Sequence, residues 1–296
     1  MNEPIDFRHI TEEISGSHPE QNVFFLLDHG GLPRLAQQLQ HCSTEWVSLF
    51  DHTKEEGALA VAPILVLAAH RGKIRLSRLV FDWLRQHGIY SSTVMILVSP
   101  LDLTSLANQL GRRLHVTLTE GVEVMLRFFD PRVFESLLNV MTRQQAEEFL
   151  CIASSWYYVD RTGRIVHSSA KLKEAELISE PLSLSQRQET LLLEDSEVDQ
   201  ILDLLKSNAP ELLSRLPFES QHNFILESVV EGRKENLVSL KQLSLYTMIR
   251  FFSSKELMPI KINQEIIDHL SSNKFAELAA VLAENISWES KGGDND

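Results

Sequence analysis

The stretch that decides the fold runs FDWLRQHGIYSSTVMILVSPLDLTSLANQL at residues 81–110 and continues as HVTLTEGVEVMLRFFDPRVFESLLNVMTRQQAEEFL at residues 115–150. It contains, in order, the end of an amphipathic helix, an apolar run of strand length at Thr93–Val98, and a Ser-Pro turn followed by a second helix. Apolar and polar residues then alternate on both sides of Glu120-Gly121, which predicts a β-hairpin. Because strands and helices alternate, this stretch predicts a layered α/β domain.

The alternation extends outward in both directions. Apolar runs predict strands at Val23–Leu27, Trp46–Phe50 and Val61–Leu67, and a second hairpin at Trp156–Val159 with Arg164–Val166. Because a hairpin places antiparallel strands side by side, the sheet is expected to be mixed and not purely parallel. The sequence therefore predicts an α/β N-terminal lobe with a mixed sheet flanked by helices.

An amphipathic helix is predicted at Ile74–His87, closed by Gly88, a residue type that is common just after a helix end. The apolar residues that share one stripe of this helix are Leu76, Leu79, Val80, Trp83 and Leu84. We expect this stripe to pack against the sheet.

The chain is expected to divide into an α/β domain and a helical lobe. Residues 1–21 are polar and predict a flexible leader before the α/β domain at residues 22–167. Residues 168–188 are rich in Ser, Lys and Glu, which predicts a linker. Residues 189–290 keep only helical spacing, which predicts an all-helical C-terminal lobe, and residues 291–296 predict a disordered tail.

The composition is that of a folded protein. Of 296 residues, 43% are hydrophobic and 23% are charged. The longest apolar runs, around Val61–Ala69 and Val94–Val98, are too short to cross a bilayer, and no signal-peptide pattern precedes them. We therefore expect a cytoplasmic protein without membrane insertion. Cys42 and Cys151 lack metal-site spacing and are expected to be free thiols.

The net charge of −13 is unevenly distributed. Residues 1–170 carry 15 basic and 19 acidic side chains, whereas residues 171–296 carry 13 and 22. Such an acidic field repels phosphate backbones, so nucleic acid is not an expected partner. The acidic second half can attract a basic partner surface, although a solvated helical surface explains it equally well.

Two predicted strand ends carry side chains of the kind that bind metals. Asp28-His29 and Asp51-His52 follow two strands, and carboxylates and imidazoles can hold a metal there. One hypothesis is therefore a metal-dependent or hydrolytic enzyme that uses Asp28, His29, Asp51 and His52. The alternative is that both Asp residues belong to turns and caps, with exposed histidines beside them. Because no HExxH, GxSxG, GxGxxG or P-loop pattern is present, the sequence predicts no catalytic residue, no metal site and no cofactor.

The hexapeptide Arg127–Arg132, RFFDPR, predicts a strand–helix corner. Strand alternation would place Leu126 and Phe128 on one face of the strand, and Arg127 and Phe129 on the other. Asp130 is expected to cap the helix that begins at Pro131. Arg127 can pair with a carboxylate such as Asp130, so the corner is interpreted as structural and not catalytic.

Five further motifs occur in a fixed order along the chain. They are Phe-Phe-Leu-Leu-Asp ending at Asp28, Leu-Phe-Asp-His-Thr-Lys-Glu at 49–55, Ala-Pro-Ile-Leu-Val at 62–66, Trp-Leu-Arg-Gln-His-Gly at 83–88 and Ser-Pro at 99–100. With RFFDPR, these motifs resemble, from about residue 22 to 162, the effector chaperones (adaptors) of bacterial type VI secretion systems, the Tap or TEC adaptor domain. The residues that carry the resemblance are Asp28, Pro63, Trp83, Pro100, Arg127, Asp130, Pro131 and Arg132.

The resemblance implies a cytoplasmic adaptor that binds a toxin effector protein and loads it onto a VgrG-type spike protein, without a cofactor and without turnover. This chain departs from the family pattern at His52, where the family has Gly, and at Phe129, where it has Tyr. The helical region after the α/β lobe varies within the family. Residues 185–290 are therefore expected to select the effector.

The helix predicted at Leu237–Phe252 is apolar on more than one face. If it is partly exposed, its aromatic and Met side chains suit a client-binding groove. The candidate partner-binding residues are then Tyr246, Met248, Ile249, Phe251 and Phe252. The alternative is that this helix is simply buried in the core of the lobe.

Overall fold

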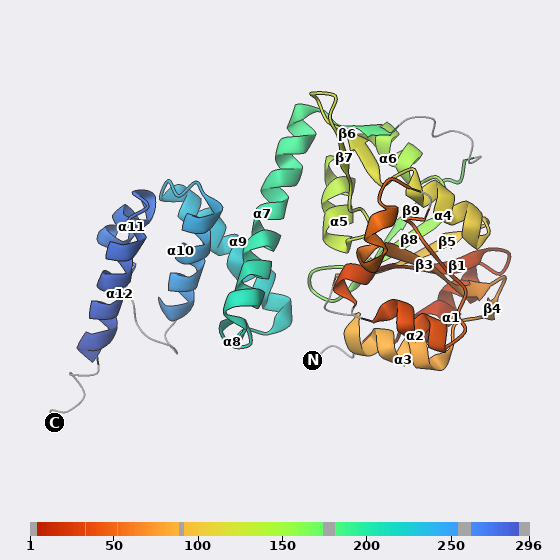
Figure 1. Cartoon of the computed structure of the whole chain (residues 1–296), viewed down its shortest axis with the longest axis horizontal. Coiled ribbons are helices and arrows are strands. Elements are labelled where there is room, and N and C mark those ends of the chain that lie inside the picture. The colour runs from red at the N-terminus through yellow and green to blue at the C-terminus, as the bar shows by residue number, and fades with distance from the viewer. Residues whose placement is uncertain are drawn as a thin grey trace. The chain divides into compact units, whose positions relative to one another are not determined.

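The computed structural model describes residues 5–32, 34–51, 53–88, 92–173, 181–253 and 262–289. The chain divides into two compact units, Met1–Leu193 and Glu194–Asp296. The first unit contains two sheets with helices packed around them, and the second contains helices (Figure 1). The expected fold class is thereby confirmed.

The large sheet of the first unit has seven strands in the order β2-β3-β1-β5-β8-β9, with β4 paired to β3. Its strands are β1 (Asn22–Asp28), β2 (Trp46–Ser48), β3 (Pro63–His70), β4 (Lys73–Ile74), β5 (Val94–Ser99), β8 (Ser155–Val159) and β9 (Ile165–Ser169). All of its strand pairs are antiparallel. Every residue of the central strand β1 is buried, which explains why it appears in the sequence as an unbroken apolar run.

A small second sheet has the order β10-β6-β7, formed by β10 (Leu182–Ser183), β6 (His115–Thr117) and β7 (Glu123–Met125). The predicted hairpin is β6–β7, with Gly121 at a φ of 75° in its turn. β10 pairs with β6 in parallel, so this sheet is mixed. The expectation of mixed pairing is therefore met in the small sheet, whereas the large one is antiparallel.

Helices cover both faces of the large sheet (Figure 1). One face is covered by α1 (Phe7–Ser17), α2 (Leu35–His41) and α3 (Arg78–His87), and the other by α4 (Leu103–Gly111), α5 (Pro131–Val140) and α6 (Arg143–Leu150). Short 3-10 helices, η1 (His29–Gly31) and η2 (Glu56–Val61), follow β1 and precede β3. Alternate residues of β1 therefore enter two separate cores, with Phe24 in one and Phe25 in the other.

The boundary between the units falls within α7 (Gln186–Asn208). The second unit continues with α8 (Pro210–Leu213), α9 (Phe218–Lys234), α10 (Leu240–Ser253), α11 (Gln264–Ser271) and α12 (Phe275–Glu289). Its core includes the fully buried side chains of Ile201, Ile225 and Leu243. No strand occurs among its described residues.

The N-terminal stretch differs from the flexible leader expected at residues 1–21. It contains α1, whose Phe7 is 1% exposed and whose N-terminus is capped by the Asp6 carboxylate. The apolar residues Phe7, Ile10 and Ile14 are three and four positions apart and face the core. Their helical spacing was not recognised in the sequence because polar residues surround these three positions.

The polar stretch 168–188 also contains more structure than a linker. β9 extends to Ser169, β10 pairs with β6 at Leu182, and α7 begins at Gln186. Residues 174–180 and the expected tail at 291–296 lie outside the described residues.

The predicted helix at Ile74–His87 begins four residues later than expected. Ser77 caps α3 by accepting a hydrogen bond from the Val80 backbone N–H, while Ile74 belongs to β4. Leu79, placed by its spacing on the buried stripe, is 67% exposed. The predicted apolar stripe was wrong at Leu79 because its spacing was counted from Leu76, which lies before the first residue of α3.

Candidate functional site

Three segments that are distant in sequence meet at one corner of the first unit. Asp28 ends β1 and lies opposite Pro63, the first residue of β3. The chain between β7 and α5 brings Arg127 to the same place, where its Nη2 donates a 2.8 Å hydrogen bond to Asp28 Oδ2 across 99 positions of sequence. We call Asp28, Pro63, Arg127, Asp130 and Arg132 the signature corner.

Asp28 is a buried carboxylate with few partners. Its side chain is 5% exposed, and Oδ1 accepts one hydrogen bond of 3.0 Å from the Gly30 backbone N–H. The Arg127 side chain is 55% exposed and its guanidinium lies 5.4 Å from the centre of the Phe129 ring. The arginine thus covers the aspartate on one side and presents its other side to solvent.

Burial raises the pKa of Asp28 above its usual value. The charge of Arg127 and the hydrogen bond from Gly30 lower the pKa, but together they do not offset the loss of hydration, and the nearby charge of Asp130 raises it further. Perturbed pKa values of this kind occur both at functional sites and in structural ion-pair networks.

Asp130 has the role that the sequence predicted, with a different arginine as its partner. It caps α5 by accepting a 2.9 Å hydrogen bond from the Arg132 backbone N–H. Its carboxylate also accepts hydrogen bonds from the Arg132 side chain, at 3.1 Å from Nε and 2.8 Å from Nη2. Arg127 thus pairs with a carboxylate as expected, but the carboxylate is Asp28, whereas Asp130, the example that the sequence offered, pairs with Arg132.

Strand alternation failed at Phe129. β7 ends at Met125, and Phe128 and Phe129 form a turn, so they no longer point to opposite faces. Both rings are buried in the same core, at 0% and 1% exposure, and contact each other edge to face with 6.1 Å between ring centres. Since Phe129 is buried there, its aromatic ring serves packing.

The remaining signature residues do not join this corner. Trp83 lies on α3, where its ring contacts His87 with 5.0 Å between ring centres. Pro100 follows β5, whose last residue Ser99 pairs with Asn22 at the opposite end of β1 from Asp28. The residues that carry the resemblance therefore lie at several places in the first unit, and only some of them belong to the signature corner.

The metal hypothesis is not supported by the arrangement of the side chains it named. Asp28 pairs with Arg127, Asp51 is exposed, and His52 lies outside the described residues. His29 Nδ1 is buried and has no hydrogen-bond partner among the residues described. Within those residues, no three His, Cys, Asp or Glu side chains lie close enough to hold a metal ion.

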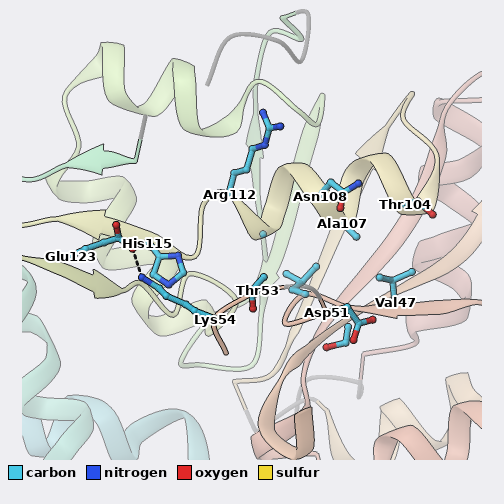
Figure 2. Close-up of a pocket in the computed structure, with 13 residues that line it drawn as sticks. Val47, Asp51, Thr53, Lys54, Thr104, Ala107, Asn108, Arg112, His115 and Glu123 are labelled. Atoms are coloured by element: carbon cyan, nitrogen blue, oxygen red, sulfur yellow. Dashed lines mark hydrogen bonds and ion pairs between the residues drawn. The ribbon is translucent and has the colours of Figure 1, made fainter. Parts of the chain in front are cut away.

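A cavity of about 680 Å³ lies between β2, α4 and the β6–β7 hairpin (Figure 2). Lys54 and Glu123 form an ion pair at this cavity, and His115 Nε2 lies 2.8 Å from Glu55 Oε1. Burial raises the pKa of Glu55, but the hydrogen bonds from His115 and Thr53 outweigh it and leave that pKa lowered. No pattern in the sequence indicates this cavity, because its residues come from segments without any shared spacing.

The helix proposed to bind a partner is α10, and its candidate residues are mostly in the core. Tyr246, Ile249 and Phe251 are 5%, 3% and 2% exposed, while Met248 and Phe252 are half-buried against the same core. The alternative left open by the sequence, a buried helix, describes α10 better. Among the described side chains of the second unit, the large apolar ones that are exposed are Leu204, Leu226, Val230 and Val238.

Comparison with known proteins finds a family model that matches part of the first unit. Residues 23–148 match the family model described as a domain of unknown function (DUF4123), and the signature corner lies within this match. No curated protein and no solved structure matches the chain. Among the residues that the structure describes, no helix has both the length and the apolar character needed to cross a membrane.

Cys42 and Cys151 are both free thiols.

Proposed function

We propose that this chain is an adaptor that binds a type VI secretion toxin effector and brings it to a VgrG-type spike protein, acting by binding and not by turnover. The observation that carries the proposal is the family match over residues 23–148, which contains the ordered motifs that resemble the adaptors. The resemblance to the adaptors extends from about residue 22 to 162, which includes the whole of the family match.

Two physical features support a binding role. The signature corner fixes β1, β3 and the start of α5 to one another, so the first unit can present a rigid surface. The net charge of −13 keeps a protein with exposed apolar side chains in solution before its client is bound.

The direct test is recovery and reconstitution of the complex. A tagged full-length chain, isolated after cross-linking from the organism that makes it, is expected to bring with it a toxin and a spike protein, identified by mass spectrometry. The purified proteins should then form a complex. Deletion of the chain should remove the toxin from the secreted fraction while the spike is still exported. Unchanged toxin secretion in the deletion strain would contradict the proposal.

We also propose that the helical region selects the effector. The test is an exchange of residues 185–290 between this chain and an adaptor with another effector. Specificity is expected to follow the exchanged helices. If it follows residues 22–162 instead, the selecting surface lies in the first unit.

The competing hypothesis is an enzyme that uses Asp28, His29, Asp51 and His52. It predicts one equivalent of zinc or manganese in the purified protein, whereas the adaptor hypothesis predicts far less than one equivalent. Elemental analysis of the full chain, with an Asp28→Asn variant as control, distinguishes the two. A stoichiometric metal that is lost in the variant would favour the enzyme.

A further inference from the structure

We infer that β9, the outer strand of the large sheet, binds an extended, acidic segment of the client by adding it to the sheet as a further strand. The inference rests on the proposed function, because the client is the toxin that the adaptor binds. β9 ends the strand order, with β8 as its one neighbour among the described strands. It is also the longest strand at either end of that sheet, since β2 at the other end has three residues.

The hydrogen-bond pattern shows which backbone groups of β9 point outward. The Asp160 N–H donates to the Arg164 carbonyl, and the Ala170 N–H donates to the Ser154 carbonyl. In an antiparallel pair, hydrogen-bonded and non-hydrogen-bonded residue pairs alternate. Counting along the register from these two ends, Val166 and Ser168 bond to β8. The N–H and C=O groups of Ile165, His167 and Ser169 therefore point away from it.

The residues of β9 themselves lack the charged side chains and prolines with which proteins protect sheet edges. Its five residues, Ile-Val-His-Ser-Ser, include no proline and no Lys, Arg, Asp or Glu, and the register with β8 is unbroken. Its residues are half-buried or exposed, with His167 and Ser169 exposed. By contrast, β2 contacts α4, and its residues Val47 and Ser48 line the cavity of Figure 2. An open row of backbone donors and acceptors is complementary to another extended main chain.

The charges beside β9 indicate the chemistry of the segment that it would bind. Arg164 precedes the strand and Lys171 follows it, and both side chains are exposed. These two cations flank β9 on a chain whose net charge is −13, although Glu147 lies near Lys171 and Asp160 lies beside Arg164. A client segment with acidic side chains and extended backbone would match both the charge and the hydrogen-bonding groups.

Residue-resolved amide exchange measured by NMR tests the inference on the full chain, free and bound to the toxin identified under "Proposed function". In the free chain, the amides of Ile165, His167 and Ser169 should exchange fast, while those of Val166 and Ser168 are protected. In the complex, all five should be protected. This change at alternate residues is a pattern that general stabilisation of the fold would not produce.

Two substitutions at one position separate backbone from side-chain recognition. His167→Pro removes an outward N–H without removing a bond to β8, and should weaken toxin binding by about 10- to 100-fold, as expected when a buried carbonyl loses its donor. His167→Ala keeps the N–H and should bind within about threefold of the native chain, because loss of an exposed side chain has a small effect. Equal melting temperatures show that both variants are folded. If the proline variant unfolds, the amide-exchange pattern decides alone.

Each other outcome overturns the inference in a recognisable way. A toxin complex that leaves these three amides exchanging fast means that the client docks elsewhere, and the adaptor function stands. Protection already present in the free chain means that another segment of the chain covers β9, and protection that grows with protein concentration means that a second copy does. If no toxin complex forms at all, the proposed function fails and the inference fails with it.

Discussion

The two units of the chain are stabilised in different ways. In the first unit, residues far apart in sequence pair directly, as Arg127 does with Asp28. In the second, adjacent helices pack at close range: Gly232 on α9 lies against α10, and the buried Gln242 on α10 donates hydrogen bonds of 3.0 and 3.2 Å to the carbonyls of Leu270 and Ser271. Long-range pairs require particular residues at particular positions. Helix packing requires mainly apolar residues with the right spacing, so it leaves weaker motifs.

The largest effect is expected where α9 and α10 approach each other. A Cβ added at Gly232 would lie 2.9 Å from Leu243 Cδ2 and 3.3 Å from Tyr246 Cδ1. Gly232→Val should therefore lower the free energy of unfolding by about 2–3 kcal/mol, the upper part of the range for overpacking a core. Gly16→Val is the matched control, because nothing lies within 4 Å of a Cβ at that position on α1. Denaturant unfolding followed by circular dichroism measures both, and equal effects would contradict the proposed close packing.

A smaller loss is expected at the signature corner. Asp130→Ala removes both the cap of α5 and the carboxylate partner of Arg132, and should lower the free energy of unfolding by about 1–3 kcal/mol. Asp102→Ala removes an exposed cap, whose Oδ1 accepts from the Ser105 N–H at 2.8 Å, and should lower it by about 1 kcal/mol or less. If the Asp102 variant proves the less stable of the two, the arginine pairing at Asp130 contributes little.

The sequence predicted the elements of the first unit well where a local signal exists. Apolar runs marked β1, β3 and β5, the turn at Glu120-Gly121 marked the hairpin, and Asp130-Pro131 marked the start of α5. These signals depend on the residues next to one another, and tertiary packing does not alter them.

What the sequence could not predict depends on contacts across the fold. It offered the nearby Asp130 as an example of a carboxylate partner for Arg127, because nothing in the sequence indicated that Asp28 lies at the same corner. It treated Phe129 as a strand residue because the turn after Met125 has no sequence marker. The cavity beside His115 and the buried face of α10 likewise arise only once the helices and strands pack.

The smallest effect, and the sharpest probe of the corner, is the pH dependence at Asp28. Because the pKa of Asp28 is raised in the folded chain, its carboxyl contributes fully to stability below the unfolded value of 3.8 and loses that contribution as pH rises through the folded pKa. Asp28→Asn removes this titration and keeps an oxygen that can accept from the Gly30 N–H. Relative to the native chain, the variant should therefore gain stability between pH 4 and pH 7.

Denaturant midpoints of the native chain and the Asp28→Asn variant, measured across this pH window, check the sign. Arg127→Ala sharpens the comparison, because removing the guanidinium leaves a buried carboxylate without its partner. That substitution should destabilise the native chain at pH 7 and have little effect in the Asp28→Asn background. If the Asn variant instead loses stability relative to the native chain as pH rises, the charge of Arg127 outweighs the loss of hydration at Asp28. The pKa of Asp28 would then be lowered by folding and not raised.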